Sequence, residues 1–190
     1  PTAYVIAKYF GKGQGKLILA ITLPTWINML VRTYAWRGIL QKDGLINAIL
    51  GLVGIGPLQT LETNFAVILG MVYNFLPFMV LQIYSSLSKM DESYIQAASD
   101  LGANKVQTFL KVTLPLSIPG IISGVTLVFL PAVSSFFIPK LLGGGKFVLI
   151  GNVIENQFLT AGNWGFGSAI SLIMAIIIMI SMYFARRVDK

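Results

Sequence analysis

Long apolar segments alternate with short polar ones along the whole chain. Four segments are apolar over about 20 residues, the length that an α-helix needs to cross the hydrocarbon core of a membrane. They are residues 17–36, 65–87, 112–138 and 166–185. The pattern predicts an all-α membrane protein, a polytopic helical bundle with one transmembrane domain over residues 1–190. Residues 1–7 are too short to span and are expected to be the end of a truncated helix, which would make the domain incomplete at its N-terminus.

The composition supports a membrane protein and argues against an enzyme. Hydrophobic residues make up 55% of the chain and charged residues 11%, whereas roughly 25% of an ordinary soluble domain is charged. The chain has no cysteine, which excludes disulfides and thiolate sites. It also has no histidine, the commonest general base and metal ligand. We therefore expect neither a catalytic site nor a metal or cofactor in this chain.

The positive charge follows the pattern of membrane topology. The net charge is +7, but the basic residues lie between apolar segments and not on one face, so nucleic-acid binding is not expected. One side has nine basic residues: Lys8, Lys12, Lys16, Lys89, Lys105, Lys111, Arg186, Arg187 and Lys190. The other side has five: Arg32, Arg37, Lys42, Lys140 and Lys146. Short loops that are richer in Lys and Arg stay in the cytoplasm, so residues 88–111 and the C-terminus are assigned to that side.

Arg32 lies near the end of the first span, beside Tyr34 and Trp36. An arginine at the centre of a bilayer costs about 2.5–3.5 kcal/mol on insertion scales. Near a helix end it can extend its charge into the headgroups, and aromatic neighbours are typical of that depth. We expect an interfacial anchor, and a contact with substrate is the alternative.

The two loops assigned to the outside are long and rich in glycine, at residues 38–64 and 139–165. Each contains a short apolar stretch, Leu45–Val53 or Val148–Ile154, that could form a strand or a helix in the membrane interface. The cluster Gly143-Gly144-Gly145-Lys146 is not a phosphate-binding loop, because that motif needs a glycine four residues before Gly-Lys and a Ser or Thr after the lysine.

The polar segment between the second and third spans predicts two short helices. Asp91 or Ser93 can cap the first helix, and Gly102 can end it. A second helix would start near Asn104 and continue into the membrane. An ordinary amphipathic connector is the alternative, and composition alone does not exclude it.

This segment resembles the loop with which permeases of bacterial ABC importers dock on their ATPase. That motif reads Glu-Ala-Ala, three residues, Gly, nine residues, Ile-x-Leu-Pro, and the chain departs from it at Gln96, in place of Glu, and at Val112. The resemblance implies an ATPase-coupling loop with these residues: Gln96, Ala97, Ala98, Asp100, Gly102, Leu114 and Pro115. At position 96 a salt bridge to the ATPase is lost, but a hydrogen bond can still form.

The resemblance extends over the chain, to the permease family of importers that depend on a binding protein, and among these to the spermidine/putrescine type. It rests on Leu23–Trp26, Arg32–Trp36, Leu76–Val80, Tyr84–Leu87 and Leu149–Ile154. It implies a heterodimer with a second permease in the bacterial inner membrane. Two ATPase subunits that bind ATP and Mg²⁺ and an extracytoplasmic substrate-binding protein would complete the complex.

Polar and aromatic residues within the spans are candidates for the translocation path. Prolines and hydroxyls inside an apolar helix need partners or water, and an amide such as that of Asn74 can equally form a hydrogen bond between helices. The candidates are Trp26, Asn28, Tyr73, Asn74, Ser134, Ser135 and Phe136. Packing between helices is the alternative for each of them.

The sequence therefore predicts a non-catalytic permease subunit of an ATP-driven importer, and the resemblance implies spermidine or putrescine as the substrate. The same architecture could carry another solute, such as an opine, an amino-acid derivative or iron. A membrane channel or scaffold without an ATPase is a further alternative.

Overall fold

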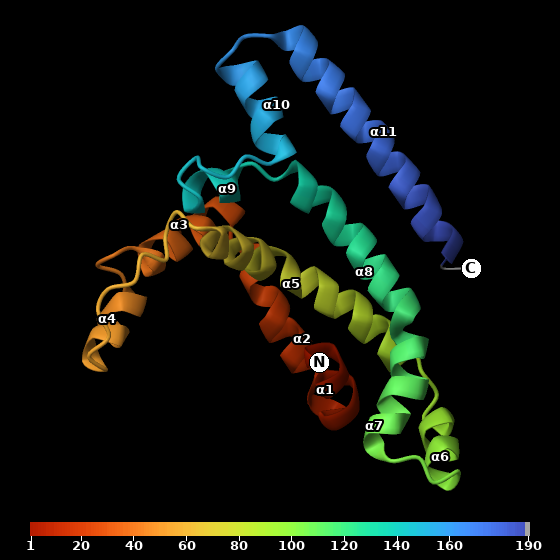
Figure 1. Ribbon diagram of the computed structural model, residues 1–190. Coiled ribbons are helices and arrows are strands. Elements are labelled where there is room, and N and C mark those ends of the chain that lie inside the picture. The colour runs from red at the N-terminus through yellow and green to blue at the C-terminus, as the bar shows by residue number, and fades with distance from the viewer. Residues whose placement is uncertain (189–190) are drawn as a thin grey trace. The chain divides into compact units, whose positions relative to one another are not determined.

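The computed structural model describes residues 1–188, including the side chains of all of these except Lys12 and residues 184–188. Two of the basic residues that favour a cytoplasmic C-terminus, Arg186 and Arg187, therefore have side chains outside the described set, and Lys190 lies outside it entirely. The described residues form helices and no strand (Figure 1). The helices are α1 (Thr2–Tyr9), α2 (Gln14–Thr22), α3 (Met29–Leu40), α4 (Leu45–Leu52), α5 (Asn64–Ser88), α6 (Ser93–Asp100), α7 (Lys105–Thr108), α8 (Leu114–Ser134), α9 (Phe137–Leu142), α10 (Ile150–Leu159) and α11 (Trp164–Val188). Two short 3-10 turns, η1 (Gly11–Gly13) and η2 (Leu23–Trp26), and a π-turn, η3 (Phe109–Thr113), complete them.

Three helical stretches of the described chain are long and apolar enough to cross a membrane. They are Asn64–Ser88, Lys105–Ser134 and Trp164–Tyr183. The sequence pattern predicts spans over 65–87, 112–138 and 166–185 in these places. A fourth crossing results if the bent pair Gln14–Trp26 and Met29–Leu52 counts as one broken span.

The first predicted span, residues 17–36, is divided in the structure. The backbone bends by 91° between Trp26 and Met29. Pro24 cannot continue an α-helix because it lacks an N–H and its ring meets the carbonyl four residues earlier. Asn28 then adopts an extended conformation and accepts a hydrogen bond from the backbone N–H of Leu30 at 2.8 Å, which caps α3. Two helices therefore replace the continuous one.

The third predicted span, residues 112–138, ends earlier than its apolar composition suggests, at Ser134. In a continuous helix Pro139 would meet the carbonyl of Ser135, and instead it lies in the first turn of α9, where no N–H is needed. The start of α10 packs on this break, where Asn152 Nδ2 donates to the carbonyl of Phe136 at 2.8 Å. Gly151 is required there, because a Cβ would lie 2.5 Å from the carbonyl oxygen of Ser134.

The chain divides into two compact units. The first contains residues 1–23 and 77–128 and the chain from Ile180 on, and its core is formed by Ala3, Ile6, Val80 and Leu87. Two polar bonds brace it, since Tyr84 Oη donates to Gln14 Oε1 and Gln14 Nε2 donates to the carbonyl of Ala7, both at 2.9 Å. This unit contains the whole predicted coupling loop, residues 88–111.

The second unit contains residues 24–76 and 129–179. Its core is formed by Leu40, Ile138 and Leu142, which are fully buried. Gly70 on α5 lets α9 approach, because a Cβ there would meet the side chains of Leu142 and Ile138. Every candidate residue for the translocation path lies in this unit.

The two glycine-rich loops contain helices α4 and α10, where the sequence left a strand or a helix open. Asn47, on α4, is buried and forms three hydrogen bonds to the backbone. Its Nδ2 donates to the carbonyls of Gln41 and Leu58, and its Oδ1 accepts from the N–H of Leu58. Thr60 Oγ1 adds a bond to the carbonyl of Leu40 at 2.9 Å. One amide thus closes the segment between residues 41 and 58.

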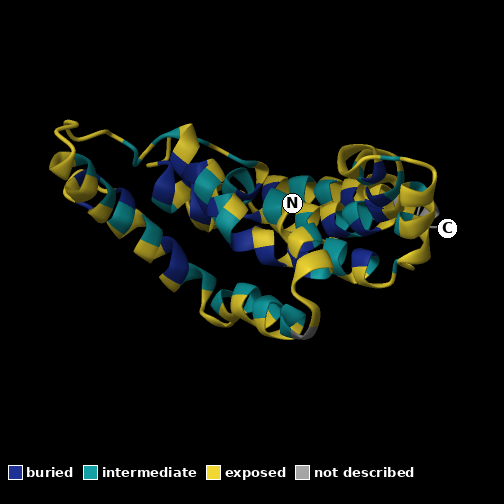
Figure 2. Ribbon diagram, turned by 90° about the horizontal axis from the view of Figure 1, so that it is seen from below, coloured by how far each residue is buried: buried dark blue, intermediate teal, exposed yellow. Residues whose placement is uncertain are grey.

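Many large apolar residues of the long helices are exposed, and exposed positions are drawn in yellow along the helices in Figure 2. Only 11% of the most apolar stretch of α11 is buried within the chain. Apolar surface of this extent is covered by lipid or by another subunit.

Candidate functional site

The first short helix of the predicted coupling loop, α6, begins at an acidic turn. Asp91 Oδ1 accepts a hydrogen bond from the backbone N–H of Ser93 at 2.9 Å. This bond and a second one from the Ser93 side chain hold the pKa of the Asp91 carboxyl below its usual value. Asp91 is thus charged at the N-terminal end of α6, where negative charge is favourable.

The turn between α6 and α7 depends on Gly102. Its φ is +78°, in the left-handed region that residues with a Cβ avoid. The N–H of Gly102 donates to the carbonyl of Ser99, and the N–H of Ala103 donates to that of Ala98, which is the Schellman arrangement. Asn104 then caps α7 through reciprocal bonds with Gln107, both at 2.9 Å. The turn is therefore four residues long, and each of its backbone N–H groups donates a hydrogen bond.

A π-turn joins this loop to the membrane. Over Phe109–Thr113 the helix widens, and the N–H of Leu114 donates to the carbonyl of Phe109, five residues earlier. Pro115 explains the wide turn, because in an α-helix its ring would meet the carbonyl of Lys111. The Leu-Pro pair of the motif thus sets the geometry at which the loop enters α8.

Helices α6 and α7 with their turn form a projection, residues 93–108, that exposes apolar side chains. Gln96, Ala97, Asp100, Leu114 and Pro115 are exposed, and Ala98 is half-buried. Next to them Leu101 is 88% exposed. Tyr94, Val106 and Leu110 are also exposed. Small and apolar residues together at the surface favour contact with another protein.

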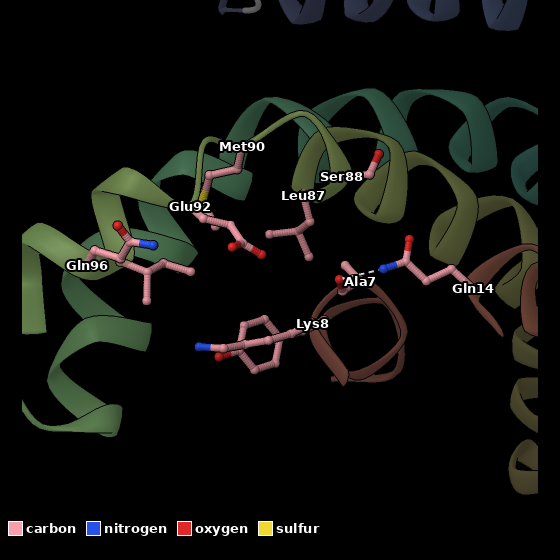
Figure 3. A pocket seen from close by; sticks show the side chains of 10 residues that line it. Ala7, Lys8, Gln14, Leu87, Ser88, Met90, Glu92 and Gln96 are labelled. Carbon is pink, nitrogen blue, oxygen red and sulfur yellow. Dashed lines mark hydrogen bonds between the residues drawn. The ribbon is translucent and has the colours of Figure 1, made fainter. Parts of the chain in front are cut away.

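A pocket of about 370 Å³ lies between α1 and α6 (Figure 3). Glu92 and Gln96 line it from the α6 side, and Lys8 and Tyr4 line it from α1. The Lys8 ammonium lies 5.6 Å from the centroid of the Tyr4 ring. Gln96, the position that departs from the permease motif, therefore borders a pocket that the Lys8 side chain also lines.

The path candidates of the second unit divide into two groups. One group lies at helix breaks: Trp26 is 76% exposed in η2, and Asn28 caps α3. Ser134 and Ser135 lie at the end of α8, and Phe136 packs its ring on Phe137 with centroids 4.1 Å apart. The other group, Tyr73 and Asn74, lies within α5.

Arg32 corrects an expectation from the sequence. It is 9% exposed and does not extend toward the surface as an interfacial anchor would. Its guanidinium carbon lies 6.0 Å from the centroid of the Tyr73 ring, and Trp36 forms a T-shaped contact with the same ring, with centroids 5.3 Å apart. The neighbour of this charge is the Tyr73 ring on α5, which no sequence pattern pairs with α3.

Several buried polar atoms of the described chain have no hydrogen-bond partner in it. They are Nε and Nη1 of Arg32, Oδ1 of Asn74, Oγ1 of Thr113 and Oγ of Ser135. The sequence pointed to Asn74 and Ser135 and kept a substrate contact of Arg32 as an alternative, but it did not predict that Arg32 and Trp36 both contact the Tyr73 ring. The available signal for this shared contact was the spacing of four residues between Arg32 and Trp36, which places both on one face of α3.

Comparison with known proteins identifies the type of chain. Residues 17–190 match the family model described as "Binding-protein-dependent transport system inner membrane component". The chain is 42% identical to the spermidine/putrescine transport system permease protein PotB of Haemophilus influenzae, covering 100% of this chain and 67% of that protein. It is 43% identical to PotB of Escherichia coli, covering 93% and 65%, and 33% identical to the inner membrane ABC transporter permease protein YdcU of that species, covering 98% and 64%. The chain thus spans about two thirds of the length of these relatives.

The fold is also similar to that of solved structures. A bacterial ABC transporter involved in the import of the acidic polysaccharide alginate matches with a TM-score of 0.79 over 100% of this chain and 71% of that one, at 17% identity. The alginate transporter in complex with its pentasaccharide-bound periplasmic protein matches with a TM-score of 0.80 at 18% identity. The predicted all-helical membrane fold is confirmed, and the roles of the individual site residues stay predictions.

Proposed function

The chain belongs to the family of binding-protein-dependent transport system inner membrane components, and from that premise we propose that it forms half of the translocation path of an ATP-driven importer for spermidine and putrescine. It is a multi-pass permease of the inner membrane and has no catalytic role. ATP and Mg²⁺ bind to a partner ATPase in this proposal, and the chain converts the ATPase movement into opening and closing of the path.

The projection formed by α6 and α7 is the coupling surface. Two fully bonded helix ends meet at Gly102, so the projection can move as one piece. Its exposed apolar residues, Leu101 above all, fit a groove on a soluble partner. Through η3 the projection is covalently continuous with α8, which passes a movement at the ATPase to a membrane-spanning helix.

The orientation follows from charge. Residues 88–111 and the C-terminus face the cytoplasm in this proposal, because the short loops on that side have more basic residues. The loops that contain α4 and α10 then face outward, where a substrate-binding protein delivers its cargo. A second permease subunit supplies the other half of the path, and two ATPase subunits complete the complex.

The substrate rests on the names of the similar permeases. PotB of two species matches over nearly the whole chain at 42–43% identity. The chemistry of the described spans is compatible with an organic cation: aromatic faces attract ammonium groups, and the Tyr73 ring turns such a face to Arg32 in the second unit.

Transport by the assembled complex tests the proposal. The full-length permease is reconstituted in liposomes with its sister permease, ATPase and binding protein, and uptake of labelled spermidine and putrescine is measured. We expect accumulation that requires both ATP and the binding protein, with a non-hydrolysable ATP analogue as the control. If neither polyamine accumulates or stimulates ATP hydrolysis, the substrate is wrong. Flux that does not depend on ATP would indicate a channel.

A further inference from the structure

Arg32 is a buried cation that is not neutralised by a carboxylate of the described chain. The ion pairs of its unit lie elsewhere: Lys140 pairs with Glu155 at 2.6 Å and Lys146 with Glu62 at 3.2 Å. Arginine stays protonated in proteins, and a buried charge without a partner is costly. A specific interaction must therefore keep the guanidinium in this place.

That interaction is the face of an aromatic ring. The Arg32 guanidinium carbon lies 6.0 Å from the centroid of Tyr73, within the range of a cation–π contact. Trp36, one turn further along α3, forms a T-shaped contact with the same ring at an interplanar angle of 71°. Tyr73, on α5, thus packs against α3 and turns the face of its ring to the Arg32 guanidinium.

We propose that Tyr73 and Trp36 form an aromatic subsite for an alkylammonium group of the substrate, and that Arg32 is a resident cation that the substrate displaces from it. The inference rests on the proposed polyamine function. The face that holds a guanidinium is chemically suited to an ammonium group, because both are attracted by the same ring quadrupole.

Asn74, the residue after Tyr73 on α5, is not assigned to the subsite, because neighbouring residues of a helix lie on different faces. Its side chain is 2% exposed and its Nδ2 donates to the carbonyl of Gly70 at 2.8 Å, so its orientation is fixed. Its Oδ1 has no donor among the described residues.

Arg32 gives the subsite selectivity. A fixed positive charge in a transport path raises the barrier for small cations. A polyamine can compete because its further ammonium groups bind elsewhere on the path at the same time, and linked groups bind more strongly than single ones. Arg32 thus makes the site discriminate in favour of long polycations.

The test measures KM and the maximal rate of spermidine uptake by the reconstituted complex. Tyr73→Leu removes the aromatic face and should raise KM by about two- to thirty-fold, the range that a cation–π contact gives. Tyr73→Phe keeps the face and should leave KM near the wild-type value. Tyr34→Leu is the matched control, because Tyr34 is an exposed tyrosine on α3, and it should have no effect.

Arg32→Gln provides the second arm. Loss of the competing cation should lower KM for spermidine, whereas Arg32→Lys should keep it near the wild-type value. An unchanged KM in Tyr73→Leu, or a raised KM in Arg32→Gln, overturns the inference while uptake by the wild type still supports the proposed function. Absence of polyamine uptake by the wild type overturns both.

Discussion

Leu114 donates its backbone N–H to the carbonyl of Phe109, five residues earlier, at the place where the predicted coupling loop continues into α8. The wide turn leaves its mark on Thr113. Elsewhere in the described chain the hydroxyls of Thr33 and Thr126 donate to the carbonyl four residues earlier, whereas the buried Oγ1 of Thr113 has no such bond. π-turns are found frequently at functional sites.

Pro115→Ala should convert this turn into regular α-helix. Alanine supplies the missing N–H for the Lys111 carbonyl, so the extra residue of the turn is lost and the projection rotates by about 100° relative to α8. We expect uptake per ATP hydrolysed to fall about five-fold, as an equilibrium shift of about 1 kcal/mol would give. Pro119→Ala, four residues further on, leaves the π-turn in place and should keep the wild-type ratio. Equal ratios in both variants would show that the turn has no part in coupling.

Gly102→Ala should loosen the turn between α6 and α7. A residue with a Cβ pays about 1–2 kcal/mol in the left-handed region, although no atom lies within 4 Å of the position where the Cβ would be placed. Amide exchange at the end of α6 should accelerate by about five- to thirty-fold, and uptake should uncouple from ATP hydrolysis. Asn tolerates this conformation, so Gly102→Asn should stay close to the wild type. A similar effect of both substitutions would indicate that size, and not backbone conformation, matters.

Gly151→Ala should destabilise the second unit. Its Cβ would lie 2.5 Å from the backbone oxygen of Ser134, and relief of such overlap costs about 1–3 kcal/mol. The measurement is the midpoint of thermal unfolding in detergent. Gly38→Ala is the control, because Gly38 is helical with open space around it, and alanine should stabilise the helix there by about 0.5–1 kcal/mol. A midpoint for Gly151→Ala at or above the wild-type value would contradict the close packing of α10 on the break after α8.

Asp91 should make the start of α6 sensitive to acid. Its pKa is lowered in the folded chain from an ordinary value of 3.8. The charged form therefore stabilises the turn above that value, and the stabilisation is lost as the pH falls through the lowered pKa. The mobility of a spin label at position 94 should increase below about pH 4. Asp91→Asn should remove this response, and Asp100→Asn, at the other end of α6, should leave it unchanged.

Sequence patterns predicted the elements of this protein better than the joints between them. Uncharged apolar runs located the long helices because a membrane requires that length and composition. Pro24 and Pro139 were visible in the sequence, but a proline alone does not show where the chain leaves a helix and where the next helix begins. At these two breaks the side chains of Asn28 and Asn152 fix the new direction through hydrogen bonds to the backbone. Gly102 was predictable because a left-handed helix end needs glycine.

The environment of Arg32 could not be read from the sequence. As long as the helix that packs on α3 is unknown, the charge and the neighbouring aromatic residues favour an interfacial anchor and a buried cation equally well. The pairing of α3 with Tyr73 on α5 is a tertiary contact between residues 41 positions apart, and no local period encodes it.

The amide of Asn47 has a consequence for how such a chain can diversify. Because one side chain bonds the backbone at both Gln41 and Leu58, the intervening residues are closed at their base and need no contacts at their tip. Insertions and substitutions concentrate at tips of this kind. An evolving lineage could therefore lengthen or rewrite residues 53–56 and so change what this loop contacts, while the helices of the second unit keep their sequence.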